Sequence, residues 1–278
     1  MNQPLQRYMQ ADLVSVVVSA TCDEGGIRKS RLVCVAEETP VAFRYSGFAH
    51  AVMMATPCDL EDFAAGFSIS EGVIESCSDC PDVAVSHGSE GITVDIPLTG
   101  RHLHRYLAGR RIRQMRGHTS CGLCGVEDLK DVARPQTRVT PSLPLDAELI
   151  VAALAALRQW QPLSRLTRCA HASAWVNSDG NLHTVREDVG RHNSLDKLIG
   201  ALARGGARRP DGFCLVTSRC SFEMVQKAVA AGFPGLVSAG APTAQAIRLA
   251  AAAGLTLYSL SRDGEPLLFT SPSQENDT

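Results

Sequence analysis

The sequence lacks several features that would place it in a broad class of proteins. Its net charge is only −2 at pH 7, so no overall basic field marks a general binder of nucleic acid or of membrane surfaces. It contains no run of about 18 apolar residues, so we expect no transmembrane helix. With 45% hydrophobic and 20% charged residues, its composition is that of a globular protein and excludes a disordered chain, a collagen-like repeat or a coiled coil.

The signatures of three enzyme classes are also missing. There is no GxxxxGK[ST] loop, which excludes a P-loop enzyme, and no GxGxxG loop, which removes the common dinucleotide fingerprint. A zinc deaminase needs His-x-Glu together with Pro-Cys-x-x-Cys. No histidine here is followed two residues later by glutamate, so deaminase chemistry is excluded whatever the fold.

A secretory signal pattern is not present at the N-terminus either. Arg7 is the one basic residue before the apolar run 13–18, and Asp12 directly precedes that run, where a signal peptide would not carry a charge. We therefore expect a β-strand there, a cytoplasmic protein, and cysteines that are mostly reduced. Several of the ten cysteines stand in strand-like apolar surroundings and are expected to be buried, namely Cys22, Cys34, Cys169 and Cys214.

The length of 278 residues favours two domains, and the stretch 137–145, with two prolines, is the best linker. Residues 1–136 are predicted to form a smaller, β-rich N-terminal domain that ends in an arginine-rich segment and a Cys-x-x-Cys loop. Residues 137–278 alternate between strands and helices, which predicts an α/β domain with a mostly parallel three-layer sheet. The fold class is therefore α/β, or α+β for the whole chain. Ligands of such a sheet bind beyond the C-terminal ends of its strands.

Hydrophobic periodicity and turn residues place the elements more closely. In the first domain, strands are predicted at 13–19, 31–36, 41–45, 51–54, 83–85 and 91–96, and a helix at 59–71. In the second, strands are predicted at 172–177, 182–185, 213–217, 236–238 and 255–260, and helices at 146–160, 194–203, 222–231 and 243–253.

The sharpest local motif is a pair of thiols, Cys121 and Cys124, with glycines beside them in Ser-Cys-Gly-Leu-Cys-Gly. Such a pair can serve redox exchange, metal binding or sulfur transfer, and in each case the thiolate is the reactive species. Six arginines between 101 and 116 precede the motif, and no acidic residue lies between Asp95 and Glu127. This positive field is expected to lower the pKa of the thiols and to attract anions. A solvated surface is the plainer interpretation of such an arginine-rich helix.

A second Cys-x-x-Cys, formed by Cys77 and Cys80, leaves room for a four-cysteine zinc site with Cys121 and Cys124. The gap between the two pairs far exceeds the roughly 15–20 residues usual in such sites. Thioredoxin-like exchange expects its Cys-x-x-Cys near a βαβ pattern, which this motif precedes. Both alternatives are weaker than sulfur transfer but stay open.

Polar loops follow several of the predicted strands in the second domain. They are 187–193, 217–219, 238–240 and 261–264. Loops from the carboxyl ends of adjacent parallel strands converge on one edge of a sheet, so these predict a pocket. The first also begins a helix, whose N-terminal amides favour anions. Its alternative is an ordinary capped helix with surface ion pairs.

Taken together, these segments resemble the formate dehydrogenase accessory sulfurtransferases, the FdhD family. The resemblance runs from about residue 30 over nearly the whole chain. It is carried by TSCGLCGVEDL at 119–129, by His171-Ala172 with Trp175, by EDVGRHNSLDKLIG at 187–200, and by TSRCSFEMVQKAVAAGFPGLVSAGAPTAQAIRLA at 217–250.

The resemblance implies a cytoplasmic homodimer whose larger domain has a cytidine-deaminase-like fold without zinc. It implies that sulfur is accepted as a persulfide from a cysteine desulfurase and passed to the molybdenum cofactor in its bis(guanine dinucleotide) form, which then enters formate dehydrogenase. Cys121 would carry the persulfide, and Cys124 would assist by relaying or protecting the sulfur. The cofactor is a bound substrate, and neither an intrinsic metal nor a nucleic-acid or membrane partner is expected.

The family's cofactor-binding segment falls on Leu260, Ser261, Arg262, Asp263, Gly264 and Glu265. Arg191 and His192 are further candidates for binding the cofactor. Arg219, Arg262 and Arg191 could clamp its phosphates, and Asp188 could accept hydrogen bonds from guanine. Two other functions stay open, a chaperone that holds the cofactor or the apo-dehydrogenase without transferring sulfur, and a zinc-structured interaction module.

Overall fold

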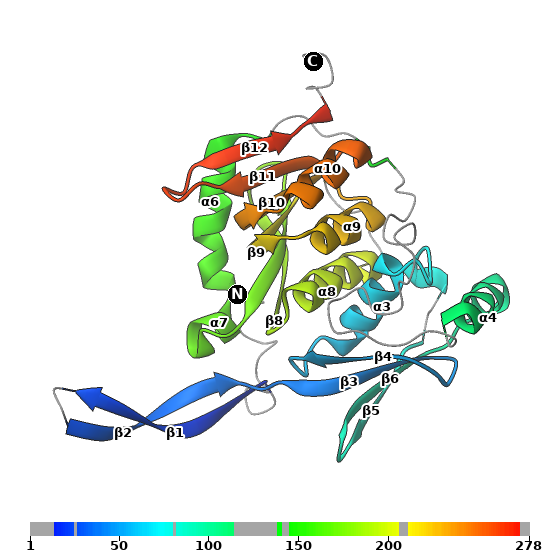
Figure 1. The fold of residues 1–278 in the computed structure, drawn as a ribbon, viewed down its shortest axis with the longest axis horizontal. Helices are drawn as coiled ribbons and strands as arrows, with labels where there is room; N and C mark the ends of the chain where they lie inside the picture. Colours follow the sequence, from blue (N-terminus) through cyan, green and yellow to red (C-terminus); the bar gives the residue numbers. More distant parts are fainter. Residues whose placement is uncertain are drawn as a thin grey trace.

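The structure is a computed structural model, and it describes residues 14–24, 27–79, 82–113, 138–140, 145–205 and 211–272. Within these residues the chain forms a two-stranded, a four-stranded and a six-stranded sheet, together with the helices that pack on them (Figure 1). The predicted mixed α/β class is confirmed. The likeness to cytidine deaminases and the domain boundary at 136/137 stay predictions. No helix in the described part is long and apolar enough to cross a membrane.

The two-stranded sheet is a long hairpin that projects away from the body of the molecule (Figure 1). Its strands are β1 (Ser15–Glu24) and β2 (Ile27–Ala36), which pair antiparallel along their whole length. We call this hairpin the arm. Its base lies near α7 (Pro162–Thr167), a short helix of the second half of the chain.

The four-stranded sheet follows directly, in the order β4-β3-β6-β5. Alternate residues of β3, Val41, Phe43 and Tyr45, point to one face and are buried beneath α3, as period-2 alternation requires. A further helix, α4, comes after the last strand of the sheet. The elements are β3 (Thr39–Tyr45), β4 (Phe48–Ala55), α3 (Leu60–Ser70), η1 (Cys77–Asp79), β5 (Ala84–Gly88), β6 (Gly91–Ile96) and α4 (Gly100–Arg113).

The six-stranded sheet has the order β12-β11-β10-β9-β7-β8. Only β9–β10 and β10–β11 pair parallel, whereas β7–β8, β7–β9 and β11–β12 pair antiparallel. The prediction of a mostly parallel sheet is therefore wrong. The reason is that β7–β8 and β11–β12 are joined by short hairpin turns, which allow only antiparallel pairing. The strands are β7 (His171–Asn177), β8 (Leu182–Asp188), β9 (Gly212–Cys220), β10 (Gly235–Pro242), β11 (Thr256–Leu260) and β12 (Pro266–Thr270).

Helices cover both faces of the six-stranded sheet (Figure 1). One core contains Trp175, Leu198 and Met224 and lies beneath α8, α9 and α10, and the other contains Ile150, Leu157 and Val176 and lies beneath α6. The Asp146 side chain accepts a hydrogen bond from the Glu148 amide and so caps α6. The helices are α6 (Ala147–Leu157), which continues as η2 (Arg158–Trp160), α8 (Arg191–Arg204), α9 (Phe222–Ala230) and α10 (Ala244–Ala253).

The two larger sheets meet where α3 crosses α8. Gly66 and Gly200 lie at this crossing, and a Cβ on either would collide with the backbone carbonyl oxygen of Asp196 or Asp62, respectively. Only glycine permits so close an approach of two helix backbones. The two halves of the chain therefore pack backbone to backbone at this point.

Ion pairs around the buried Asp62 reinforce this contact. The guanidinium group of Arg186 on β8 donates two hydrogen bonds, of 2.8 and 2.6 Å, to one carboxylate oxygen of Asp62 on α3. Arg204, at the end of α8, donates to the other oxygen of Asp62 over 2.6 Å. Asp62 thus joins two arginines of the second half to the first half.

An arginine-lined pocket at one edge of the six-stranded sheet

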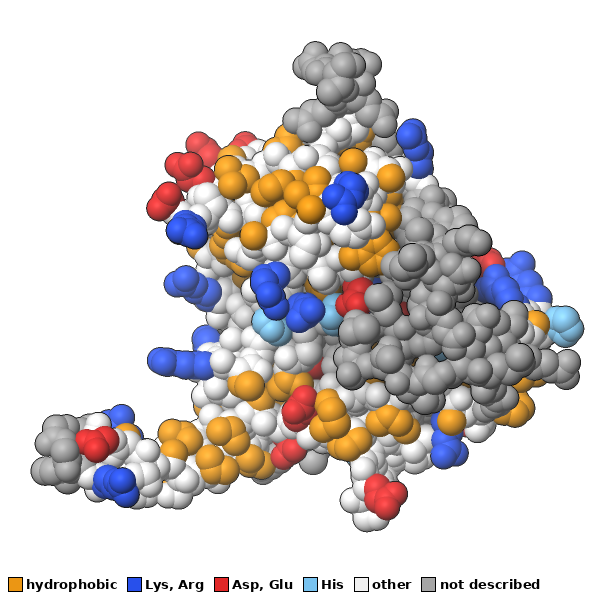
Figure 2. All heavy atoms as spheres, viewed as in Figure 1, with side chains coloured by type: hydrophobic (Ala, Val, Ile, Leu, Met, Phe, Trp, Pro, Cys, Tyr) orange, Lys and Arg blue, Asp and Glu red, His pale blue; other side chains and the backbone are white. Residues whose placement is uncertain are grey.

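A pocket of about 310 Å³ opens at one edge of the six-stranded sheet. It is lined by His171, Arg191, Thr217, Ser218, Arg219, Ala239 and Gly240. Three of the four predicted polar loops supply all of these residues except His171, and Figure 2 shows basic and histidine side chains grouped in the middle of this face of the molecule. We call it the arginine pocket.

Strand direction brings these residues together. β8, β9 and β10 run the same way, so Arg191, Arg219 and Gly240 all lie at or just beyond the carboxyl ends of their strands. β7 runs in the opposite direction, so its first residue, His171, lies at the same edge. The sequence alone did not place His171 in the pocket, because a mostly parallel sheet would have put the start of its strand at the far edge.

Local hydrogen bonds hold the pocket in shape. The Thr217 hydroxyl accepts a hydrogen bond of 2.8 Å from the Ala172 amide, which ties β9 to β7. The Ser238 hydroxyl donates to the Gly240 carbonyl oxygen over 2.8 Å where the pairing of β9 and β10 becomes irregular. A Cβ at Gly240 would lie 3.1 Å from Cα of Arg219, so a larger residue would push Arg219 out of place.

The pocket is suited to an anion. Its lining contains two guanidinium groups and no carboxylate. It also lies at the start of α8, whose cap residue Gly190 offers no side-chain acceptor to the first amides of the helix. Nε of Arg191 is buried and has no hydrogen-bond partner among the described residues.

His171 contributes a neutral ring at pH 7. Burial, and next the positive charge of Arg191, lower its pKa below the ordinary value of 6.5. His171 therefore adds a third positive charge to the pocket only at acidic pH.

His192 lies next to the arginine pocket but is not among its lining residues. Its Nε2 is 2.7 Å from a carboxylate oxygen of Glu223, in the first turn of α9. The neighbouring His192 ring lowers the pKa of Glu223 below its ordinary value of 4.5. The pair thus joins the beginnings of α8 and α9, and a role of His192 in binding the cofactor stays a prediction.

Asp188 cannot bind guanine as the sequence suggested. It is completely buried, and its carboxylate accepts hydrogen bonds from the amides of Thr56 (3.1 Å) and Gly190 (2.8 Å) and from the side chain of Asn193 (3.0 Å). Lys197 lies 2.6 Å from it and completes its surroundings. Asp188 therefore stabilises the loop before α8 from the protein interior.

The predicted cofactor segment, Leu260–Glu265, forms the turn of the β11–β12 hairpin. The Ser261 amide donates to the Glu265 carbonyl oxygen over 2.7 Å, and the Ser261 hydroxyl accepts from the amides of Asp263 and Glu265. Arg262, Asp263 and Gly264 are exposed. The turn follows β11 at the same edge of the sheet, but none of its residues lines the arginine pocket.

Comparison with known proteins assigns the chain to a family. The model of the FdhD/NarQ family matches residues 36–275. The chain belongs to the FdhD/NarQ family. The matched range includes the arginine pocket and both Cys121 and Cys124, whereas β1 and nearly all of β2 precede it.

Individual FdhD/NarQ relatives match over most of their length. The chain is 44% identical over 274 residues to the sulfur carrier protein FdhD of Xanthomonas euvesicatoria, covering 99% of this chain and 96% of the relative. It is 46% identical over 240 residues to the sulfur carrier protein FdhD of Cupriavidus necator, covering 86% and 83%. A crystal structure described as a formate dehydrogenase accessory protein, from Desulfotalea psychrophila, superposes with a TM-score of 0.72 at 24% identity, over 93% of this chain and 98% of that one. At this identity the likeness concerns the fold alone.

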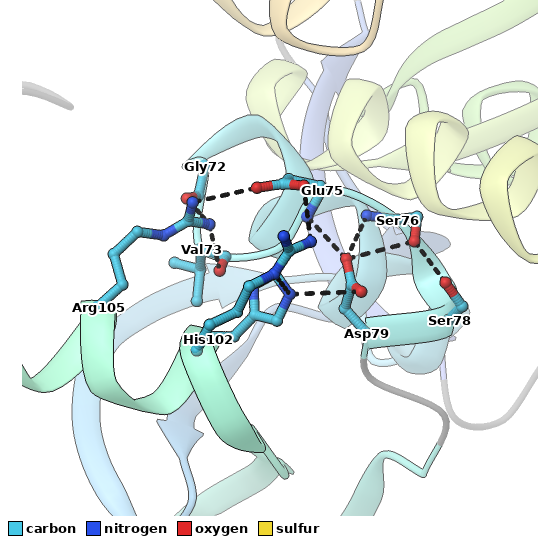
Figure 3. A network of polar contacts seen from close by, with 9 residues as sticks. Gly72, Val73, Glu75, Ser76, Ser78, Asp79, His102 and Arg105 are labelled. Carbon is cyan, nitrogen blue, oxygen red and sulfur yellow. Dashed lines mark hydrogen bonds and ion pairs between the residues drawn. The ribbon is translucent and has the colours of Figure 1, made fainter.

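The two cysteines of the FdhD/NarQ chain singled out by sequence, Cys121 and Cys124, lie outside the described residues, as does Cys80. The helix that leads toward them is well anchored (Figure 3). Arg101 and Arg105 on α4 each donate to the Glu75 carboxylate, over 3.1 and 3.2 Å, and Arg105 also donates to backbone carbonyl oxygens at the end of α3. The side chains of Arg101 and Arg105 are 73% and 52% exposed, so these contacts lie at the surface and agree with the plainer prediction of a solvated face.

A second contact of α4, between His102 and Asp79, is more buried than the ion pairs with Glu75. His102 is buried, and its Nε2 lies 3.4 Å from the carboxylate of Asp79. Hydrogen bonds from the backbone amide of Ser76, and next that of Glu75, hold the pKa of Asp79 below its ordinary value of 3.8, although burial opposes the shift. Asp79 thus stabilises the turn at 75–79 and also contacts α4 through His102.

The described cysteines only partly match the expectation that they are buried. Cys214 is buried, but Cys22 and Cys34 are half-buried because both faces of the arm are open to solvent, and Cys169 is exposed in the loop before β7. Burial raises the pKa of both Cys58 and Cys220 to about 12, so neither supplies a thiolate at neutral pH. The described residues contain no group of three side chains that could bind a metal, and the four-cysteine zinc site depends on residues outside them.

Proposed function

We propose that this chain is a sulfur carrier that serves a formate dehydrogenase. The observation that carries the proposal is its 44–46% identity over most of its length to sulfur carrier proteins named FdhD. The Cys121–Cys124 pair behind an arginine-rich helix supplies a suitable sulfur acceptor. The arginine pocket supplies a suitable site for an anionic cargo.

In the first step, sulfur passes from a cysteine desulfurase to Cys121. The Cys121 thiolate attacks the outer sulfur of the persulfide on the desulfurase. A new S–S bond forms on Cys121, the old S–S bond breaks, and the cysteine of the desulfurase leaves as a thiolate. No net oxidation or reduction is needed. The basic residues between 101 and 118 favour the thiolate of Cys121 before the attack and the persulfide anion after it.

In the second step, the chain hands the sulfur to the molybdenum cofactor in its bis(guanine dinucleotide) form. Arg191, Arg219 and the first amides of α8 would bind phosphate groups of this cargo by charge-assisted hydrogen bonds. A volume of about 310 Å³ is small for a ligand site, so the pocket suits one diphosphate end of the cofactor. Cys124 would relay or protect the sulfur, and the carrier would act as a cytoplasmic homodimer.

Intact-protein mass spectrometry after incubation with a cysteine desulfurase and cysteine tests the first step. The wild type is expected to gain the mass of one sulfur atom, and Cys121→Ala is expected to gain none. Cys169→Ala is the matched control, because Cys169 is exposed yet has no proposed role. No gain in the wild type, or an equal gain in Cys121→Ala, would refute transfer through Cys121.

One observation favours a second candidate function. None of the residues that line the arginine pocket is a cysteine, so the pocket could hold cofactor without any transfer of sulfur. If the chain is such a chaperone, its Cys121→Ala variant should still restore formate dehydrogenase activity when it is expressed in cells that lack their own FdhD. A sulfur carrier with the same substitution would leave the dehydrogenase inactive.

A further inference from the structure

The arm and the strand β4 carry most of the exposed large apolar side chains of the described structure. Eight of eleven lie there, namely Val16, Val17, Val18, Leu32, Val33, Phe48, Val52 and Met54. Figure 2 shows hydrophobic side chains along the arm and again over the region of β3 and β4. An accumulation of this kind marks a surface that binds another protein.

The arm itself needs a partner. β1 and β2 pair with each other and with no third strand among the described residues, and an isolated two-stranded hairpin is at best marginally stable in water. Apolar side chains also occupy both of its faces. Val17 and Leu32 belong to one face and are 66% and 76% exposed, whereas Val16, Val18 and Val33 belong to the other.

The exposed side chains of Val52 and Met54 form a second apolar surface, which we call the β4 patch. The arm of the same chain does not cover this patch. Val52 lies opposite Ala42 and Met54 opposite Pro40 in the pairing of β3 with β4, so both side chains are on the face of the sheet turned away from α3. Val52 is 68% exposed. The arm of the same chain extends sideways beyond the end of this sheet rather than across it (Figure 1).

We propose that the arm of one copy lies across the β4 patch of a second copy, and the reverse, in a twofold-symmetric exchange. The inference rests on the homodimer of the proposed function and names its surface. A two-fold pairing requires one surface to carry both complementary parts, and the arm and the patch meet this requirement on one chain. The charged residues Arg28 and Lys29 near the tip of the arm would form the polar rim of the interface.

The size of the contact agrees with a stable dimer. Each strand of the arm has 10 residues and spans about 33 Å at roughly 3.3 Å per residue, and two strands give a face about 10 Å wide. Two such faces laid on two partners bury roughly 1,300 Å² in total, within the range of about 1,200–2,000 Å² found for specific complexes.

The apolar surface of the arm has to be covered at all times, which favours a second copy of the chain over the enzymes that the carrier serves. A desulfurase and a dehydrogenase would bind in turn and leave between deliveries, and the arm would then be uncovered for most of the time. A second copy is always present. The position of the arm before residue 36, where the family match begins, also separates it from the sulfur-transfer machinery that the family shares.

Light scattering coupled to size-exclusion chromatography of the full chain tests the exchange. The wild type is expected at twice the chain mass of 29.7 kDa. Leu32→Lys on the arm and Val52→Glu on the patch should each halve that mass. Val151→Lys is the matched control, because Val151 is exposed on α6, outside the arm and the patch, and it should stay dimeric.

Mixing the two monomeric variants gives the decisive result. In a mixed dimer the arm of the Leu32→Lys copy would lie on the patch of the Val52→Glu copy, where the two introduced charges are opposite in sign. The second arm and patch would be wild type, so the dimer mass should return. Recovery also shows that both variants are folded. A monomeric wild type, a dimeric Leu32→Lys, or a mixture that stays monomeric would each overturn the exchange.

The same variants separate this inference from the proposed function. Sulfur loading on Cys121 by a desulfurase should persist in monomeric Leu32→Lys, because the arm has no part in that step. Absence of loading in all variants and in the wild type would refute the sulfur carrier and leave the exchange intact. Leu32→Lys that stays dimeric but no longer binds the dehydrogenase would assign the arm to that enzyme and overturn the exchange.

Discussion

The ammonium nitrogen of Lys197 lies 2.6 Å from a carboxylate oxygen of Asp188, and neither side chain is exposed to solvent. Both also bind the backbone of Thr56 in the first half of the chain, Lys197 to its carbonyl oxygen at 2.9 Å and Asp188 to its amide. The pair therefore fixes the loop that begins α8 against the end of β4. Arg191, in the arginine pocket, follows that loop directly.

Replacement of Asp188 by alanine should strongly destabilise the fold. It leaves the charge of Lys197 buried without its partner, which typically costs about 3–5 kcal/mol. Urea unfolding followed by circular dichroism measures the loss. Asp82→Ala, which removes an exposed carboxylate, should change the free energy of unfolding by less than about 0.5 kcal/mol. Equal effects of the two substitutions would contradict the structural role of the buried pair.

Gly66→Ala should force α3 and α8 apart. The new Cβ would collide with the backbone carbonyl oxygen of Asp196, which cannot move as a side chain could, so we expect a loss of about 3 kcal/mol or more. Gly109→Ala on α4 meets no atom within 4 Å and should instead stabilise its helix by about 1 kcal/mol. Thermal unfolding of both variants makes the comparison. A Gly66→Ala variant as stable as the wild type would show that the helices are less close than described.

Arg191→Ala and Arg219→Ala should each weaken the binding of inorganic pyrophosphate by about 10- to 100-fold, the loss of one or two hydrogen bonds to a charged group. Isothermal titration calorimetry gives the affinities. Arg262→Ala is the informative control, because Arg262 is exposed in the β11–β12 turn and does not line the arginine pocket. Its effect should be below about twofold. A large loss in Arg262→Ala with none in Arg219→Ala would move the phosphate site to that turn.

The affinity of the arginine pocket for sulfate should rise as the pH falls. Because burial and Arg191 hold the pKa of His171 below 6.5, the ring is neutral at pH 7 and gains its charge only under more acidic conditions. Sulfate affinity should therefore be flat between pH 8 and pH 7 and increase below about pH 6.5. His171→Asn should abolish the increase, and His183→Asn, an exposed histidine of β8, should retain it. A pH profile that is the same in His171→Asn and in the wild type would rule out this role.

Local patterns were sufficient for much of the secondary structure. The strand predicted at 91–96 coincides with β6, and the helix predicted at 59–71 corresponds to α3. These segments have clear apolar alternation, or a helical period bounded by proline and glycine. The strand β12 (Pro266–Thr270) was missed, because its five residues follow a turn that had been assigned to ligand binding.

The site depended on information that local patterns do not contain. The loops that carry Arg191 and Arg219 were recognised from their polar residues after apolar strands. The role of Asp188 was misjudged, because its partner Thr56 is 132 positions away in the sequence. His171 was placed only when the antiparallel direction of β7 was known. Pairing direction and long-range partners are set by tertiary packing rather than by neighbours in the chain.

Because of the contacts at Asp62 and Gly66, each half of the chain depends on particular residues of the other half. Each half has its own core, so each could in principle have diverged alone. Yet Arg186 and Arg204 need the carboxylate of Asp62, and the close approach of α3 and α8 requires glycine at both 66 and 200. A chimera that joins the first half of one relative to the second half of another should therefore fold only if its two halves carry residues that match at these positions.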